Sequence, residues 1–268
     1  MRSIAFCLFA LATVSTGSGQ IVYQSTTARL EIASDGSAIS LTERPGGQQR
    51  IVRLPLFAVK KEGRVFPASA VKWGGDLLRA SFGASGVEAD FRIASHPDAI
   101  VIQLVAARGS GIEEVRLAQL QSPLKNAGAL LGARWDEQFT VCVMGLSERV
   151  NARVEGAAVV ASVYPEYGMV GEQVAILATP TPRFLDTVRR IEREFRLPSP
   201  MLRGVWAKRW QDVRSGYLFT DLTETNVDET IRYAKLGGFR YILLYSDTWA
   251  TSLGSYPINT RNFPQGRG

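Results

Sequence analysis

The chain has 268 residues, of which 46% are hydrophobic and 21% are charged, and its formal net charge is +6. These proportions are those of an ordinary globular protein, so they exclude intrinsic disorder and a collagen-like repeat. Basic residues are scattered among acidic ones and form no Lys/Arg block. This pattern favours a solvated surface of mixed charge over a nucleic-acid-binding surface.

The N-terminus has the pattern of a secretory signal peptide. Arg2 precedes an apolar run over residues 4–14, and small residues follow up to Gly19. The run is shorter than the roughly 20 residues that a membrane-spanning helix needs. We therefore predict a cleavable signal peptide over residues 1–19 and a secreted or periplasmic protein without a membrane span. The alternative is that the run forms a buried first strand or helix.

The scarcity of cysteine and histidine restricts the chemistry that the chain can perform. Cys7 lies in the predicted signal peptide, and Cys142 lies in an apolar run, where we expect it to be a small buried residue. A single remaining cysteine excludes an internal disulfide and a zinc site of paired cysteines. His96 is the only histidine and lies in a turn-like Ser-His-Pro-Asp segment. We expect no metal and no cofactor, and chemistry based on carboxylates or hydroxyls.

From residue 21 to about residue 179 the hydrophobic pattern has a period of two. Apolar and charged residues alternate over residues 87–93, which gives a strand one apolar and one charged face. Asp35-Gly36 separates two alternating runs, which is a strong hairpin signal. Further strands are predicted at Leu77–Phe82, Val115–Leu120, Phe139–Met144, Val154–Val163 and Gln173–Ala178. Many short strands separated by turns predict a large antiparallel β-sandwich over residues 20–180.

Beyond the sandwich, the period changes to that of helices and buried strands. An amphipathic helix bounded by prolines indicates a linker helix over residues 181–200. We then predict a strand at residues 202–207, a helix with Asn226 as N-cap that stops at Gly237-Gly238, and a buried strand at residues 241–244. The predicted fold is therefore mainly β: a large sandwich, a linker helix and a β/α unit with parallel strands over residues 201–268.

Candidate binding residues follow the two predicted parallel strands, because functional groups in such folds gather beyond the carboxyl ends of the strands. Ser246, Asp247 and Trp249 follow the second strand, and Trp210 and Asp212 follow the first. A carboxylate beside a large aromatic ring suits a sugar, since the acid accepts hydroxyl hydrogen bonds and the ring packs against the apolar face of the sugar. Alternatively, Asp247 caps a turn and Trp249 covers the rim of the sheet. No catalytic pair of carboxylates can be assigned.

The order of sandwich, connecting helix and β-α-β unit resembles that of secreted glycoside hydrolases of the α-galactosidase (melibiase) type. Residues 234–244 resemble the approach to the second barrel strand of that family, and residues 256–266 resemble the loop that follows. That strand typically ends in two aspartates, a spacer and a tryptophan, which match positions 246–249 here. Ser246 stands where the family has the first aspartate, which helps to bind galactose hydroxyls. The resemblance covers roughly residues 180–268.

The resemblance implies a (β/α)8, or TIM, barrel, which takes about 250 residues, whereas residues 201–268 supply only its beginning. We therefore expect the N-terminal part of a secreted glycoside hydrolase, apparently truncated and inactive by itself, because relatives carry the catalytic carboxylates on later strands. The alternative is a non-catalytic carbohydrate-binding β-sandwich protein. Both hypotheses imply a carbohydrate partner and no nucleic acid, and neither indicates an oligomeric state.

Overall fold

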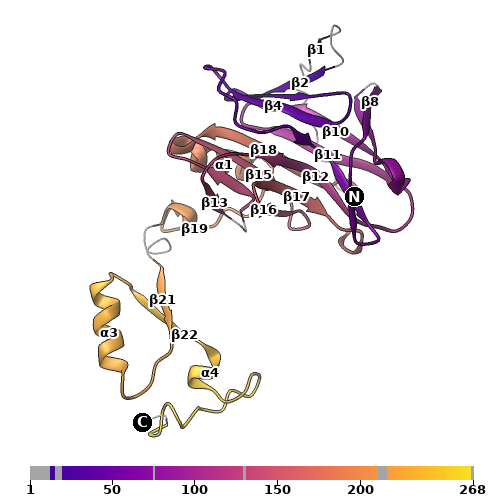
Figure 1. The fold of residues 1–268 in the computed structure, drawn as a ribbon. Helices are drawn as coiled ribbons and strands as arrows, with labels where there is room; N and C mark the ends of the chain where they lie inside the picture. Colours follow the sequence, from indigo (N-terminus) through magenta and orange to yellow (C-terminus); the bar gives the residue numbers. More distant parts are fainter. Residues whose placement is uncertain (1–12, 16–19, 75, 129–130, 211–215, 267–268) are drawn as a thin grey trace. The chain divides into compact units, whose positions relative to one another are not determined.

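The computed structural model describes residues 13–15, 20–74, 76–128, 131–210 and 216–266. The chain forms two compact units, Met1–Leu197 and Pro198–Gly268. Strands dominate the described residues (Figure 1), so the expected mainly-β fold with a sandwich, a helix and a partial β/α unit is confirmed. None of the helices in these ranges is both long and apolar enough to cross a membrane.

The first unit is built from antiparallel sheets. The N-terminal sheet has the order β1-β2-β3-β4-β5, with β1 (Thr13–Ser15), β2 (Gln20–Gln24), β3 (Ala28–Ile32), β4 (Ser37–Glu43) and β5 (Leu54–Pro55). The large sheet has the order β13-β14-β15-β18-β11-β10-β9-β8, with β8 (Ala70–Gly74), β9 (Leu77–Ser81), β10 (Glu88–Ser95), β11 (Ile100–Arg108), β13 (Asn126–Gly128), β14 (Ala133–Trp135), β15 (Phe139–Gly145) and β18 (Gln173–Pro180). The β12 sheet has the order β16-β17-β12-β6-β7, with β6 (Ala58–Lys61), β7 (Arg64–Pro67), β12 (Ile112–Gln121), β16 (Asn151–Glu155) and β17 (Ala158–Val163).

The N-terminal sheet and the β12 sheet meet where β5 lies beside β12. Val52 and Gln121 form an isolated antiparallel bridge there, and the backbone N–H of Gln119 donates to the Leu56 carbonyl at 2.8 Å. All of these sheets contribute to one hydrophobic core. At its centre Phe57 and Phe91 are fully buried and stack with their ring centroids 4.1 Å apart.

The strand predictions agree with most of the sandwich. The Asp35-Gly36 hairpin joins β3 to β4, and Gly36 has a φ of +82°, which explains the need for glycine. The His96 turn joins β10 to β11, and Cys142 is buried on β15. The single strand predicted at Val154–Val163 is wrong, because β16 and β17 form a hairpin within this run.

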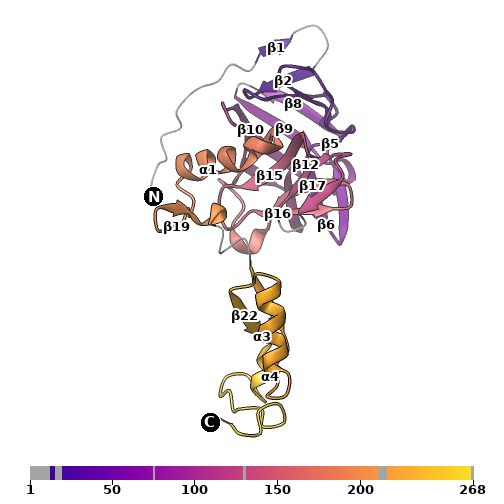
Figure 2. The ribbon, with the colours of Figure 1, turned by 90° about the vertical axis from the view of Figure 1, so that its left-hand side faces the viewer.

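The predicted linker helix belongs to the first unit and packs on its sandwich (Figure 2). Helix α1 (Phe184–Glu194) contacts β18 and follows the short 3₁₀ turn η3 (Thr181–Arg183), and its apolar residues Val188 and Ile191 are buried. Two polar contacts attach it to the β10–β11 turn. Arg190 donates to both carboxylate oxygens of Asp98 at 2.6 and 2.7 Å, and His96 Nε2 lies 2.8 Å from Glu194 Oε1. The helix is therefore attached to the sandwich by apolar packing and by polar contacts.

The second unit contains a parallel pair of strands connected by a helix. Its elements are β19 (Met201–Leu202), β20 (Val205–Trp206), η4 (Ala207–Arg209), β21 (Tyr217–Thr220), α3 (Val227–Leu236), β22 (Tyr241–Leu244) and α4 (Ser246–Trp249). The pair is β21 and β22, and α3 is the crossover between them (Figure 1). As predicted, Asn226 stands at the N-cap of α3, and Gly237-Gly238 follows its end.

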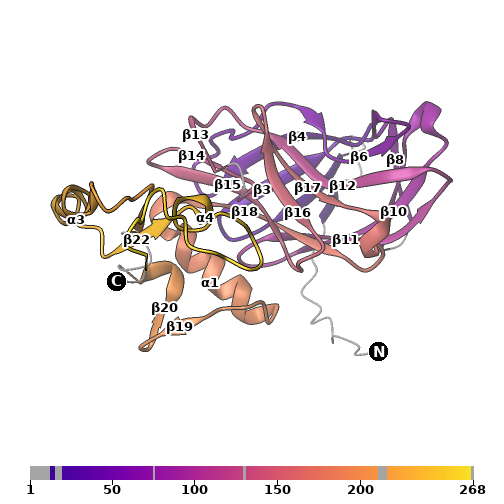
Figure 3. The same ribbon diagram turned by 90° about the horizontal axis from the view of Figure 1, so that it is seen from below.

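The prediction of a strand over residues 202–207 is wrong. This segment is a short antiparallel hairpin of β19 and β20 (Figure 3), because Arg203 and Gly204 both have positive φ and reverse the chain. The parallel partner of β22 is β21, which sequence reasoning did not identify. The predicted signal peptide lies outside the described residues, except that Thr13–Ser15 pair with β2. Its cleavage stays a prediction.

Phe91→Ala tests the core. We expect the free energy of unfolding to fall by about 3–5 kcal/mol, because the substitution leaves a cavity beside the Phe57 ring. The measurement is urea unfolding followed by circular dichroism. Val65→Ala is the control, since Val65 is exposed and should change stability little. Equal unfolding midpoints for the two variants would contradict this prediction.

Asp90→Asn tests the ion pairs that the buried Asp90 carboxylate makes with the half-exposed Arg79 and Arg108 on neighbouring strands. Arg79 donates to the Asp90 carboxylate at 2.7 Å and Arg108 at 2.6 Å, and these hydrogen bonds lower the pKa of Asp90 to about 2. Because the pKa is lower in the folded state than the roughly 3.9 of the unfolded chain, this stabilisation is complete above about pH 4 and is lost as the pH falls towards 2.

We expect the Asp90→Asn variant to be less stable at pH 7 and to lose less stability than the wild type between pH 4 and pH 2. Urea midpoints across this range measure the difference. Asp76→Asn is the matched control, because Asp76 pairs with Arg92 on the exposed surface. An unchanged pH dependence in Asp90→Asn would show that the pair does not act as described.

Candidate functional site

The parallel pair of the second unit brings two strand ends to one edge. Thr220 at the end of β21 is in register with Leu244 at the end of β22. The next residues, Asp221 and Tyr245, therefore leave the sheet at the same side. This is the edge at which ligands bind in parallel α/β folds.

Ser246, Asp247 and Trp249 lie together at this edge on α4, a single helical turn directly after β22. Thr248 is buried on the same turn, and its hydroxyl donates to the Asp221 carboxylate. This hydrogen bond joins the end of β21 to the segment that follows β22. The two strand ends thus form one local structure.

The Asp247 carboxylate is exposed and makes no hydrogen bond or ion pair with any residue in the described part of the chain. Its backbone carbonyl accepts from Asn259 Nδ2 at 2.9 Å, and the carbonyl of Thr248 accepts from Asn262 Nδ2 at 2.7 Å. Two asparagines of the following loop therefore hold the backbone of α4. The Asp247 carboxylate remains available for hydrogen bonds with a ligand.

Trp249 provides an aromatic surface next to Asp247. Its ring stacks on Tyr256 with a centroid separation of 5.4 Å and an interplanar angle of 16°. The loop that carries Tyr256 is closed by the bridge between Ala250 and Ile258. The backbone N–H of Asn259 also donates to the Trp249 carbonyl at 2.8 Å. Trp249 is still 37% exposed. It is both supported and accessible.

Trp210 is placed differently from the expectation. Trp210 follows η4 and precedes β21, so it does not follow a strand of the parallel pair. The guanidinium of Arg203 lies 5.9 Å from its ring centroid. Asp212 lies outside the described residues. A ligand-binding role for these two residues stays a prediction.

Asp221 is the strand-end residue that sequence reasoning missed. The signal was present, because aromatic and aliphatic residues over Tyr217–Phe219 directly precede Thr220-Asp221. The sequence prediction instead places the first strand at residues 202–207, a run that Arg203 and Gly204 interrupt. No group of three or more His, Cys, Asp or Glu residues that could hold a metal ion occurs in the part of the chain that the structure describes.

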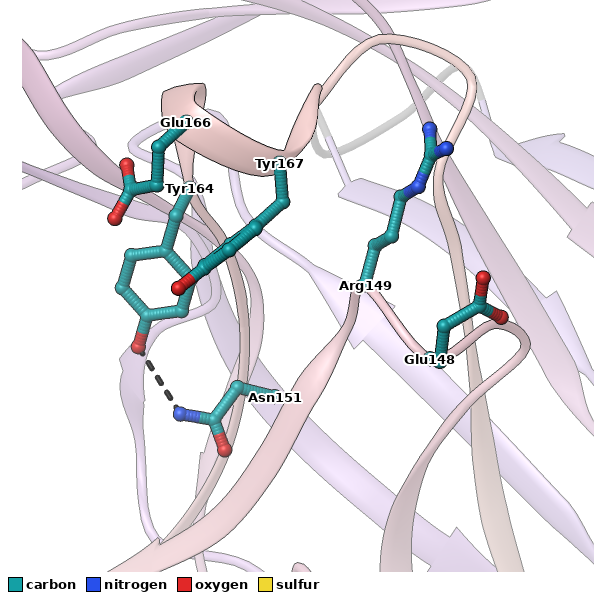
Figure 4. A pocket seen from close by; sticks show the side chains of 6 residues that line it. All are labelled: Glu148, Arg149, Asn151, Tyr164, Glu166 and Tyr167. Atoms are coloured by element: carbon teal, nitrogen blue, oxygen red, sulfur yellow. Dashed lines mark hydrogen bonds between the residues drawn. The ribbon is translucent and has the colours of Figure 1, made fainter.

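A separate cavity of about 660 Å³ lies on the first unit (Figure 4). It is lined by Glu148, Arg149, Asn151, Tyr164, Glu166 and Tyr167. None of these residues was singled out from the sequence, because they are spread over loops and an edge strand and form no motif.

Comparison with known proteins gives only distant likenesses. No family model and no curated protein matches the chain. Among solved structures, it is similar to the α-N-acetylgalactosaminidase NagBb from Bifidobacterium bifidum in complex with GalNAc, at 13% identity and a TM-score of 0.46, over 90% of this chain and 54% of that one. It is also similar to a GH31 family sulfoquinovosidase from E. rectale, at 10% identity and a TM-score of 0.36, over 79% of this chain and 39% of that one.

The chain thus spans about half the length of NagBb and less of the sulfoquinovosidase. Identities this low, with TM-scores below 0.5, give no residue-by-residue correspondence. The roles of Asp221, Asp247 and Trp249 are therefore inferred from the geometry of this chain.

Thr248→Val tests the hydrogen bond that joins the strand ends. Valine keeps the volume of the buried side chain but cannot donate to Asp221, and a hydrogen bond to a charged group contributes about 1.5–3 kcal/mol. We expect faster hydrogen exchange at the backbone amides of Thr248 and Ala250, which donate within α4. Thr251→Val, at an exposed position, is the control. Unchanged exchange in Thr248→Val would mean that the bond does not hold α4.

Proposed function

We propose that this chain is the N-terminal part of a secreted glycoside hydrolase that acts on α-glycosides and binds the saccharide at the strand-end edge of the second unit. The observation that carries the proposal is the grouping of the Asp247 carboxylate and the stacked Trp249–Tyr256 pair where two parallel strands end. An aromatic face packs against the C–H face of a pyranose, and a carboxylate accepts its hydroxyl hydrogen bonds.

The roles of the two strand-end carboxylates differ. Asp221 accepts from Thr248, so it positions α4 and has part of its hydrogen-bonding capacity occupied. Asp247 is exposed and can bind ligand hydroxyls. Retaining hydrolysis needs two carboxyl groups about 5–5.5 Å apart across the bond that is cleaved. We assign binding to Asp247 and place hydrolysis on carboxylates outside residues 216–266.

Exposed apolar side chains on the parallel pair support the proposal that the two strands belong to a larger barrel. Tyr217, Phe219, Tyr241 and Leu243 are exposed, although they belong to the two parallel strands. Parallel sheets are covered on both faces in folded proteins, and two strands alone are marginally stable. The proposal therefore includes further strands and helices that cover these side chains. The resemblance of residues 180–268 to the α-galactosidase type agrees with such a barrel.

A second candidate function is that of a non-catalytic carbohydrate-binding β-sandwich protein. The observation that favours it is the cavity on the first unit, which combines two tyrosines with an amide and charged groups. The two functions use different units of the chain. They can therefore be separated by variants in one unit or the other.

Asp247→Asn tests the proposed strand-end site. We expect the purified chain to bind 4-nitrophenyl α-D-galactopyranoside or the corresponding glucoside in calorimetry, and the variant to bind about tenfold more weakly, because a charged acceptor is lost. Trp249→Ala should weaken binding similarly. The matched control is Asp228→Asn, since Asp228 is an exposed carboxylate in the first turn of α3. We expect no release of nitrophenol by any of these proteins.

Two results would contradict the proposal in different ways. Equal affinities in the wild type and Asp247→Asn, or no binding of either glycoside, would remove the strand-end edge as a saccharide site. Steady release of nitrophenol above the buffer rate would show that hydrolysis does not need carboxylates outside this chain.

A further inference from the structure

The cavity on the first unit lies between two segments that are adjacent in space but not in sequence. One is the 3₁₀ turn η2 (Pro165–Tyr167), which follows β17, and the other is the loop that leads into β16 (Figure 4). Its volume of about 660 Å³ is within the range of pockets that hold small ligands. The strand-end edge of the second unit contributes none of its lining residues.

One wall of the cavity is aromatic and carries a matched donor and acceptor. The rings of Tyr164 and Tyr167 meet edge to face with centroids 6.5 Å apart, and Tyr167 is 63% exposed. Asn151 Nδ2 donates to the Tyr164 hydroxyl oxygen at 3.1 Å. The hydroxyl hydrogen of Tyr164 and the Oδ1 atom of Asn151 have no further partner among the described residues. A donor and an acceptor therefore lie side by side next to an accessible ring.

Asn151 on this wall lies beside a hydrogen-bond network of the β12 sheet. Asn151 on β16 opposes Ser162 on β17, and Arg153 Nη1 donates to Ser162 Oγ at 2.9 Å. Arg153 Nη2 also donates to Glu114 Oε1 at 2.8 Å. Burial raises the pKa of Glu114, but the hydrogen bonds from Ser162 and Arg153 outweigh this effect and hold the pKa below its usual value. The carboxylate stays charged at neutral pH, so this network next to Asn151 persists.

The opposite wall is the loop that carries Arg149. Its backbone amide donates to Ser147 Oγ at 3.1 Å, and its guanidinium lies 3.8 Å from the Glu172 carboxylate. Arg149 Nη1 also lies close to Gly168. A Cβ atom placed on this glycine would be 3.5 Å from Arg149 Nη1. The guanidinium thus reaches the end of η2. It offers hydrogen-bond donors from the side opposite Asn151.

The charges around the cavity favour a neutral ligand. Figure 4 shows Glu166 on the side of the two tyrosines and Glu148 beside Arg149 on the other side. An ion of either sign would meet like as well as opposite charges, because the lining carries two carboxylates and a guanidinium that lies 3.8 Å from Glu172. A neutral molecule with several hydroxyl groups and an apolar ring face can use the donors, the acceptors and the exposed tyrosine together.

We propose that this cavity is a saccharide-binding site for one or two neutral sugar rings, with Tyr167 as the stacking platform and with Asn151, Tyr164 and Arg149 as the hydrogen-bonding groups. The inference rests on the second candidate function and deepens it, since it assigns the sandwich a saccharide site of its own in addition to the strand-end edge. Its function is to hold a polysaccharide or oligosaccharide, and it includes no chemical step.

The test is a titration of the full chain with melibiose, maltose and cellobiose, followed by saturation-transfer NMR and calorimetry. We expect at least one of these neutral disaccharides to bind, and Tyr167→Ala to weaken that binding about tenfold. Tyr233→Ala is the matched control, because Tyr233 on α3 is 62% exposed and Tyr167 is 63% exposed. Tyr167→Phe keeps the ring and should retain most of the affinity.

A further variant separates this site from the strand-end site. Trp249→Ala removes the aromatic ring of the proposed strand-end site, so Tyr167→Ala is also compared with Tyr167 in chains that carry Trp249→Ala, where the loss of affinity should be the same. Asn151→Ala should weaken disaccharide binding, because both the acceptor and the partner of Tyr164 are lost. Failure of all three disaccharides to bind, or equal affinities for the wild type and Tyr167→Ala, would overturn the proposal.

Discussion

Parallel pairing of β21 with β22 is the constraint on which the strand-end site depends. Parallel strands end at the same edge of a sheet, so the pairing brings Asp221 and the segment Ser246–Trp249 together. The Thr248–Asp221 hydrogen bond then joins positions that are 27 residues apart in the chain. Helix α3 is needed between them because parallel strands require a long crossover. The proximity of Asp221 to the segment that carries Asp247 thus follows from the topology and not from a local motif.

Coverage of sheet faces decides where polar groups lie in the first unit. β18 is buried along almost its whole length, because the core covers one face and α1 packs against it as well. The β12 sheet instead has a core-facing side and an outer side on which Glu114, Arg153 and Ser162 form a hydrogen-bonded network. A buried carboxylate on a sheet is tolerated only when its oxygens are paired in this way. That network lies beside Asn151, which lines the cavity.

Both candidate sites combine an aromatic ring with hydrogen-bonding groups from different elements. At the strand-end edge, Trp249 on α4 stacks on Tyr256 in the following loop. In the cavity, Asn151 on an edge strand bonds to Tyr164 after β17. In each site, contacts between different elements hold the binding groups in place, so the positions of these groups depend on those contacts. This is the physical reason why substitutions at supporting residues such as Thr248 are expected to affect the sites.

The sequence by itself determined the class of fold and part of the strand-end site. Period-two alternation predicted most strands of the sandwich, and the run Tyr241–Leu244 followed by Ser246, Asp247 and Trp249 was correctly placed at a strand end. These features are local, because they depend on the spacing of neighbouring residues.

Only the tertiary structure decided which segment pairs with β22 and where the cavity lies. The hydrophobicity of residues 202–207 favoured a strand, but the turn at Arg203-Gly204 made it a hairpin, and β21 took the parallel position. Asp221 and Thr248, like Asn151 and Tyr164, become neighbours only through strand register and crossover connections. Such contacts between distant residues leave no periodic signal in one sequence, which is why the sequence predicted the elements but not these pairs.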